Sequence, residues 1–122
     1  MTIDLTADEK TALSVLAFLF FRMGMDERAG RIYEALAELS DAGSPDRRFA
    51  KTGEAAVKLE LGKAEAALDA LREAIPDGTP SSRDAILYLL KSRALAMAHR
   101  HSESLEALEQ FDYLTGKKTP PH

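Results

Sequence analysis

The same local pattern occurs three times along this chain, at nearly equal intervals. In each case a long run with helical periodicity ends at a short turn, and a shorter helical run follows. The turns are centred on Gly24, Gly62 and His99, which are 38 and 37 residues apart. Glycine suits the end of a helix because it adopts the left-handed backbone conformation without a steric penalty. A period in this range is typical of helical hairpins stacked as a solenoid.

Six helices are predicted from apolar spacing, cap residues and loop composition. Thr6 and Glu9 have the spacing of a capping box at the start of the first helix. The other predicted start signals are Ser44 followed by Pro45 for the third helix, and Ser81 or Ser82 for the fifth. The predicted helices span about 7–23, 26–39, 46–61, 64–75, 83–98 and 102–114.

The six helices pair into three antiparallel hairpins, at about 7–40, 46–75 and 81–114. The predicted fold is therefore all-α, and 122 residues are enough for one domain, which we place at residues 1–115. The segment 116–122 is polar and proline-rich, and it is predicted to be a disordered tail.

Composition narrows the range of partners. The chain has 16 basic and 20 acidic residues, a net charge of -4 that argues against a nucleic-acid surface. Cysteine is absent, which excludes disulfides and fits a reducing compartment. The longest apolar run is too short to cross a membrane, and acidic residues precede it, which is not typical of a signal peptide. We expect a cytoplasmic protein without membrane insertion.

The run Leu13–Met25 is apolar on nearly every side of a helix. A helix that is hydrophobic all round is normally buried all round. A chain of this length cannot surround such a helix deeply, so we expect one side to pack inside the domain and the other to meet a partner. This pattern favours a binding module over an enzyme.

The turns also carry a family resemblance. After each turn, a small residue and then an aromatic or large residue follow at the spacing of the tetratricopeptide repeat (TPR). The matching positions are Gly24, Ala29 and Tyr33, then Gly62, Ala67 and Leu71, and more weakly His99, Ser104 and Leu108. The resemblance implies a short right-handed solenoid in which Ala29 and Ala67 allow two helices to approach closely. An antiparallel bundle with alanine-rich seams is the alternative.

Three such repeats without a further domain resemble the small chaperones of bacterial type III secretion. The segment LTADEK and the run LAFLFFRMGMDERAGRIY are similar to the Y-type (YscY-like) class, with the G-type (YscG-like) needle-subunit class as the less favoured match. The resemblance implies a cytoplasmic chaperone that stabilises a small secreted client, as a heterodimer. It would hold an apolar or amphipathic client helix in a concave groove.

In the TPR arrangement the first helix of each hairpin lines the concave face. The predicted partner-binding residues are Ser14, Phe18, Phe21, Arg22, Phe49, Leu59, Ile86, Leu89 and Arg93; Thr11, Thr52, Ala56 and Met97 share that face. The alternative is that Phe18, Phe21 and Phe49 fill the core. A clamp for a client's terminal carboxylate needs asparagine side chains, and this chain has none.

Two further hypotheses remain open. One is an adaptor that homodimerises through its first helix, which also allows a homodimer when no client is bound. The other is a small-molecule or metal-dependent regulator that uses His99 and His101, although no cysteine or carboxylate pattern completes a metal site. We predict no catalytic residues, no cofactor and no metal site. Glu103, Glu106 and Glu109 are expected to form the polar face of a terminal helix.

Overall fold

The computed structural model describes residues 5–116, and the described part is all-helical, as predicted. It contains six α-helices and one short 3-10 helix. Their bounds are α1 Ala7–Arg22, α2 Asp26–Glu38, α3 Pro45–Glu60, α4 Ala64–Ala74, η1 Ser82–Asp84, α5 Ala85–Met97 and α6 His101–Leu114. The predicted disordered tail lies outside the described residues except for Gly116.

The predicted helix starts are confirmed where a cap residue defines them. The N–H of Glu9 donates to Thr6 Oγ1 at 3.1 Å, and the N–H of Thr6 donates to Glu9 Oε1 at 3.0 Å, which completes the capping box. The N–H of Arg47 donates to Ser44 Oγ at 3.1 Å at the start of α3.

The fifth helix begins differently from the prediction. A 3-10 turn, η1, precedes it, and α5 begins only at Ala85. The N–H of Ser81 donates to Asp84 Oδ2 at 2.9 Å, and the N–H of Asp84 donates to the Ser81 carbonyl at 2.9 Å. These bonds close a tighter turn than an α-helix has, so the α-helical geometry starts later.

The three turns have the same backbone geometry. Gly24, Gly62 and His99 have φ values of 77°, 75° and 62°, so all three are left-handed. In each turn the next residue donates its N–H to a carbonyl five residues earlier at 2.8 Å, from Met25 to Phe20, Lys63 to Lys58 and Arg100 to Leu95. This is the Schellman motif, and His99 adopts it without being glycine.

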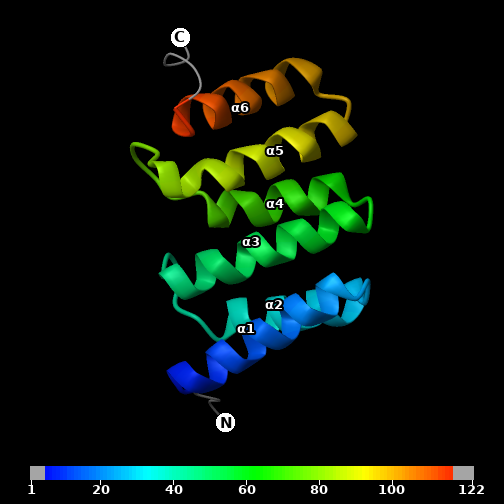
Figure 1. Ribbon diagram of the computed structural model, residues 1–122, viewed down its shortest axis with the longest axis vertical. Helices are drawn as coiled ribbons and strands as arrows, with labels where there is room; N and C mark the ends of the chain where they lie inside the picture. Colours follow the sequence, from blue (N-terminus) through cyan, green and yellow to red (C-terminus); the bar gives the residue numbers. More distant parts are fainter. Residues whose placement is uncertain (1–4, 117–122) are drawn as a thin grey trace.

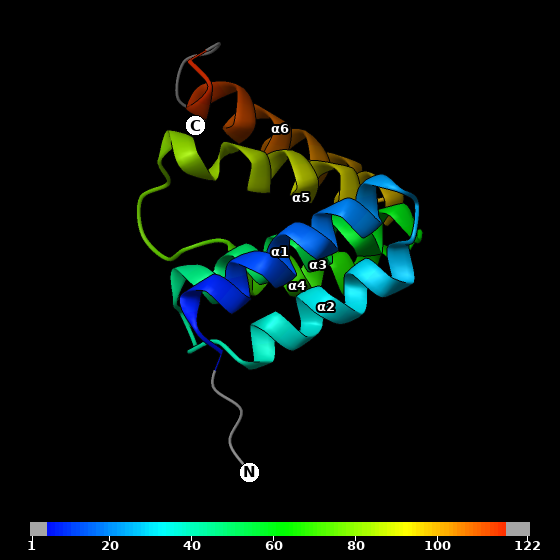
Figure 2. The ribbon, with the colours of Figure 1, turned by 60° about the horizontal axis from the view of Figure 1, so that its bottom comes forward.

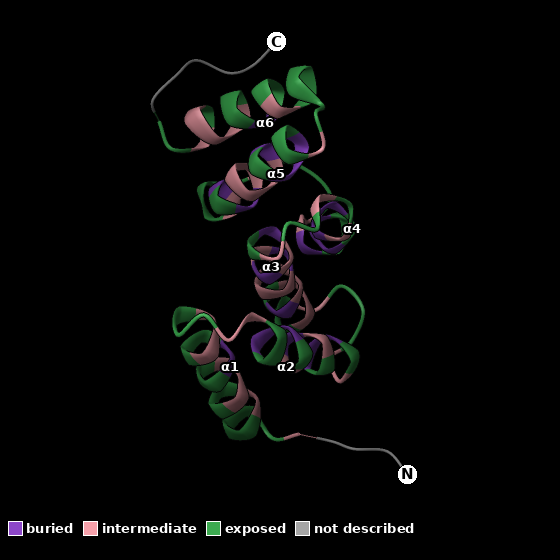
Figure 3. Ribbon diagram, turned by 90° about the vertical axis from the view of Figure 1, so that its right-hand side faces the viewer, coloured by how far each residue is buried: buried purple, intermediate pink, exposed green. Residues whose placement is uncertain are grey.

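The helices follow one another along the long axis of the molecule (Figure 1). Each packs chiefly against its neighbours in the chain, and α3 also contacts α1 and α5. Viewed from the side, α1 lies beside α2, and α3 and α5 lie to the same side of α4 (Figure 3). The connection from α4 to α5 curves outward at one side of the molecule (Figure 2).

Small residues lie where the two helices of a hairpin face each other. Seven residues before the turn the chain has Ala17, Ala55 and Ser92, and five residues after it Ala29, Ala67 and Ser104. The four alanines have no exposed surface. In the third hairpin Ser92 Oγ donates to the Ser104 carbonyl at 2.9 Å, and Ser104 Oγ donates to the Ser92 carbonyl at 2.8 Å. Hydrogen bonds thus join the helices where alanines lie in the other hairpins.

A close contact also joins the first hairpin to the second. A Cβ atom at Gly53 of α3 would lie 2.4 Å from Cε1 of Tyr33 of α2. Tyr33 is buried in a cluster with Ala17, Ala29 and Val57. The missing side chain of Gly53 therefore makes room for the tyrosine ring, which lets α2 and α3 pack closely.

Candidate protein-binding surface

The odd-numbered helices expose large apolar side chains on the same face, at positions that coincide or differ by two helical turns. Phe49 and Ile86 lie thirteen residues before their turns, and Phe18 lies six residues before its turn. Each of the three is more than half exposed. We call the exposed residues of this face the odd-helix surface; they are Thr11, Phe18, Arg22, Phe49, Ile86, Arg93 and Met97.

The other predicted partner-binding residues are less accessible. Ser14, Phe21 and Leu89 are half-buried. The hydroxyl of Ser14 donates to the Lys10 carbonyl at 2.9 Å, and Phe21 packs against the cluster around Tyr33. These three residues border the odd-helix surface and contribute only part of their side chains to it.

Leu59 was wrongly placed among the exposed anchors. Its side chain is 4% exposed and packs in a cluster with Ala67, Leu68 and Leu95. Helices α4 and α5 cover this end of α3, so Leu59 is a core residue. Phe21, at the equivalent position of α1, keeps part of its surface exposed.

A cavity of about 530 Å³ lies between α3 and the start of α5. Its apolar lining includes Phe49, Ile86 and Leu87, and Thr52 adds a hydroxyl. Charged residues of the same lining are Arg48, Arg83 and Asp84. The cavity thus brings together predicted partner-binding residues of the second and third hairpins. Its lining does not include Phe18, Arg22 or Arg93. Its mixed lining suits an apolar side chain that emerges from a polar helix.

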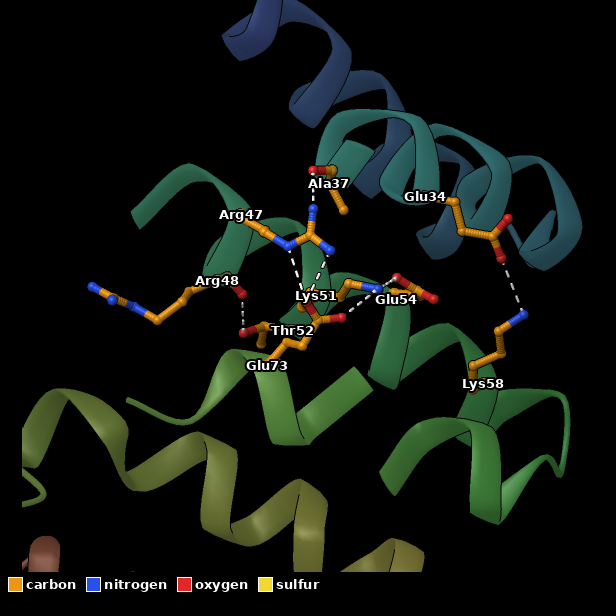
Figure 4. A network of polar contacts seen from close by, with 9 residues as sticks. All are labelled: Glu34, Ala37, Arg47, Arg48, Lys51, Thr52, Glu54, Lys58 and Glu73. Atoms are coloured by element: carbon orange, nitrogen blue, oxygen red, sulfur yellow. Dashed lines mark hydrogen bonds and ion pairs between the residues drawn. The ribbon is translucent and has the colours of Figure 1, made fainter. Parts of the chain in front are cut away.

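A network of charges links α2, α3 and α4 (Figure 4). Arg47 of α3 donates from Nη1 to the Ala37 carbonyl at the end of α2 at 2.8 Å, and from Nη2 to Glu73 Oε1 of α4 at 2.8 Å. Lys51 lies 3.1 Å from Glu73 Oε2 and 3.2 Å from Glu54 Oε2. One arginine thus ties α2, α3 and α4 to one another.

The charges shift the titration of the network. Hydrogen bonds from Arg47, then from Lys51, lower the pKa of the Glu73 carboxyl below its ordinary value. Partial burial alone would lower the pKa of Lys51, but the hydrogen bonds and charges of Glu73 and Glu54 together raise it. Both shifts favour the charged forms, so the network is intact near neutral pH.

The histidines offer no complete metal site. His99 and His101 face each other edge to face, with ring centroids 6.1 Å apart. Across residues 5–116, no group of three or more histidine, cysteine or acidic side chains could hold an ion. Likewise, none of the helices described has the length and apolar content that a membrane crossing requires.

No family model, curated protein or solved structure matches this chain. The resemblance to TPR proteins and to type III secretion chaperones therefore stays a prediction from the residues of this sequence.

Sequence reasoning did not find two features of the exposed surface. Val15, Leu16, Leu19 and Met23 form a second exposed apolar area on α1, outside the odd-helix surface. The all-round apolarity of the first helix was the available signal for it. Leu105 and Leu108 are exposed on α6 beside the predicted polar face of Glu103, Glu106 and Glu109.

Proposed function

We propose that this protein is a binding module that holds an apolar or amphipathic helix of another protein against the odd-helix surface. The observation that carries the proposal is the exposure of Phe18, Phe49 and Ile86 on three successive odd helices. Large apolar side chains that are exposed together on one face are typical of interaction surfaces, whereas single scattered ones are ordinary. Arg22 and Arg93 are exposed on the same helices and would pair with acidic residues of the bound helix.

We further propose that the three hairpins form a short right-handed solenoid of the TPR type. The identical Schellman turns and the recurring small pairs at the hairpin seams support this arrangement. A solenoid presents the first helix of every repeat on one side, which is the property that a helix-binding groove requires.

For the client, we propose a small secreted protein of a type III export apparatus, held in the cytoplasm. Its support is the resemblance of the first hairpin to Y-type chaperones, from the capping box at Thr6 to Tyr33. A G-type chaperone for a needle subunit is the alternative within the same class. On either reading we expect no enzymatic activity.

Capture of the client by paired variants tests the proposal. The tagged chain is purified from its native cells, together with Phe49→Glu and the control Leu105→Glu. Burying a phenylalanine contributes roughly 1.5–3 kcal/mol, so Phe49→Glu should weaken client binding by about tenfold or more. Leu105→Glu places the same charge at an exposed leucine of α6 and should bind normally.

The result that supports the proposal is a small stoichiometric protein of helical sequence that binds the wild type and Leu105→Glu but is lost from Phe49→Glu. A client from a secretion apparatus would support the chaperone class. Equal capture by both variants would contradict the odd-helix surface as the binding site.

One observation favours the adaptor hypothesis. Among the described residues of α1, only Ala17 is fully buried, so most of this helix is available for a partner. A homodimer through Phe18 would cover part of this helix. If Phe18→Glu converts a purified dimer into a monomer, the adaptor gains support, and an unchanged mass rejects it.

A further inference from the structure

The exposed side chains of α1 include a second set that lies outside the odd-helix surface. We call this set the α1 stripe; it consists of Ala12, Val15, Leu19 and Met23, which share one face of the helix, and the exposed Leu16 borders it. Val15 and Leu19 are each about half exposed, and Met23 is two-thirds exposed. No described helix covers this face.

The equivalent positions of α3 are covered by α2. They lie 38 residues later, at Ala50, Gly53, Val57 and Leu61. Gly53 is the close contact of the Tyr33 ring, and Val57 Cγ1 would lie 3.3 Å from a Cβ atom at Gly30. This face of α3 therefore receives the preceding even-numbered helix.

The equivalent positions of α5 are covered by α4. They lie 75 residues after the α1 stripe, at Leu87, Leu90, Ala94 and Ala98. Leu87 is buried in a cluster with Leu71, and Ala94 in a cluster with Leu68. Helices α3 and α5 thus use the same face to pack against the preceding even-numbered helix. Helix α1 has the equivalent face, but no described helix packs against it.

The other end of the molecule has the complementary feature. Leu68 and Leu71, through which α4 packs against α5, correspond to Leu105 and Leu108 on α6. On α6 these two leucines are exposed, Leu105 at 61%. Helix α6 therefore exposes the leucines that correspond to those with which α4 packs against α5. No described helix covers them.

We propose that copies of this chain associate head to tail, with α6 of one copy on the α1 stripe of the next. The contact would repeat between molecules the packing of α2 on α3 and of α4 on α5. By equivalence with Gly30–Val57 and Tyr33–Gly53, Leu105 faces Leu19 and Leu108 faces Val15. Because no glycine lies at these positions, the two helices pack farther apart than α2 and α3 do.

A second copy is the occupant because it supplies a helix with the matching positions already exposed. Pairing of α1 with α1 would place two α1 stripes together. The equivalent positions of α3 and α5 instead pack against an even-numbered helix. A head-to-tail contact uses different surfaces on the two partners, so it leaves a free end and extends into open chains. The inference does not depend on the proposed client.

Two variants, each blocking one end, test the contact. In sedimentation experiments the wild-type average mass should rise with concentration beyond that of a dimer. Leu19→Glu and Leu105→Glu should each remain at the 13.4 kDa of the monomer. Their equimolar mixture should form a 1:1 dimer of about 27 kDa, twice the monomer mass, and grow no further, because each chain keeps one working end.

The control is Ile86→Glu, which alters the odd-helix surface and should associate like the wild type. Circular dichroism checks that all variants are folded, as expected for substitutions at exposed positions. Three results would overturn the proposal: a monomeric wild type at all concentrations, a mixture that stays monomeric, or a Leu105→Glu variant that still dimerises by itself. The last would indicate pairing of α1 with α1.

Discussion

At the scale of single residues, packing depends on side chains that are small or absent. Gly53→Ala would place a methyl group within the space of the buried Tyr33 ring. Overpacking costs about 1–3 kcal/mol, and the better helix propensity of alanine returns up to about 1 kcal/mol. We expect a net loss of roughly 1–2 kcal/mol in the free energy of unfolding, measured by urea titration.

The matched control for Gly53→Ala is Gly30→Ala. Its Cβ atom would lie 3.3 Å from one methyl group of Val57, which can shift slightly. Gly30→Ala should therefore change stability much less than Gly53→Ala. Equal effects of the two substitutions would contradict the close approach of Gly53 to Tyr33.

The serine pair of the third hairpin gives a second prediction. Ser92→Ala and Ser104→Ala each remove a hydrogen bond between α5 and α6 and should each cost about 0.5–1.5 kcal/mol. The double variant places alanine at both positions, as in the first two hairpins, so its cost should be smaller than the sum. A double-mutant cycle by urea titration checks this, and strictly additive costs would show that the two hydroxyls act independently.

Residue-scale features could be predicted only where their causes are local. The capping box of Thr6 and Glu9 and the turn at Gly24 depend on a few consecutive residues, and both are confirmed. His99 was also predicted as a turn, and its φ of 62° confirms it. The contact of Gly53 with Tyr33 joins residues twenty positions apart, and no local signal indicates it.

At the scale of the elements, the Arg47 network joins three helices, and its strength depends on pH. The pKa of Glu73 is lowered in the folded state, chiefly by Arg47. Its contribution to stability is therefore present above the ordinary carboxyl pKa and is lost as the pH falls through the folded value. Because Glu73 is 46% exposed, its contribution should be below about 1 kcal/mol.

Glu73→Gln should accordingly destabilise the protein at pH 7, and the difference from the wild type should shrink as the pH falls through the lowered pKa of the wild-type Glu73 carboxyl. The measurement is the thermal midpoint of both proteins between pH 3 and pH 7. Glu38→Gln, at an exposed position of α2, is the control and should follow the wild type. A difference between Glu73→Gln and the wild type that stays constant across the whole pH range would show that charge is not its cause.

Element order and boundaries followed closely from the sequence, because caps and apolar spacing are properties of single helices. The start of α5 was the exception, since the bonds between Ser81 and Asp84 first close a 3-10 turn. Leu59 was misplaced for a different reason. Its position within α3 matches the exposed face, but α4 and α5 cover it. The periodicity of a single helix does not show which other helices pack against it.

At the scale of the whole molecule, the surfaces divide into three parts with different expected roles. The odd-helix surface is proposed to hold a client, while the α1 stripe and the exposed leucines of α6 are proposed to join copies. The sequence indicated the first through the apolar character of Leu13–Met25. The sequence did not indicate which side of that helix packs inside the domain and which side is exposed. Only the packing of α2 and α3 against it shows this.

The most direct test of the central claim is site-specific photocrosslinking of the chain to its client in cells. A photoreactive phenylalanine replaces residue 18, 49 or 86 on the odd-helix surface, or residue 105 on α6 as the control. All four native side chains are exposed, so the substitutions should leave the fold intact. We predict that positions 18, 49 and 86 crosslink to the same small protein and that position 105 does not. Crosslinks to the client from position 105 alone, or none from the odd-helix surface, would contradict the account.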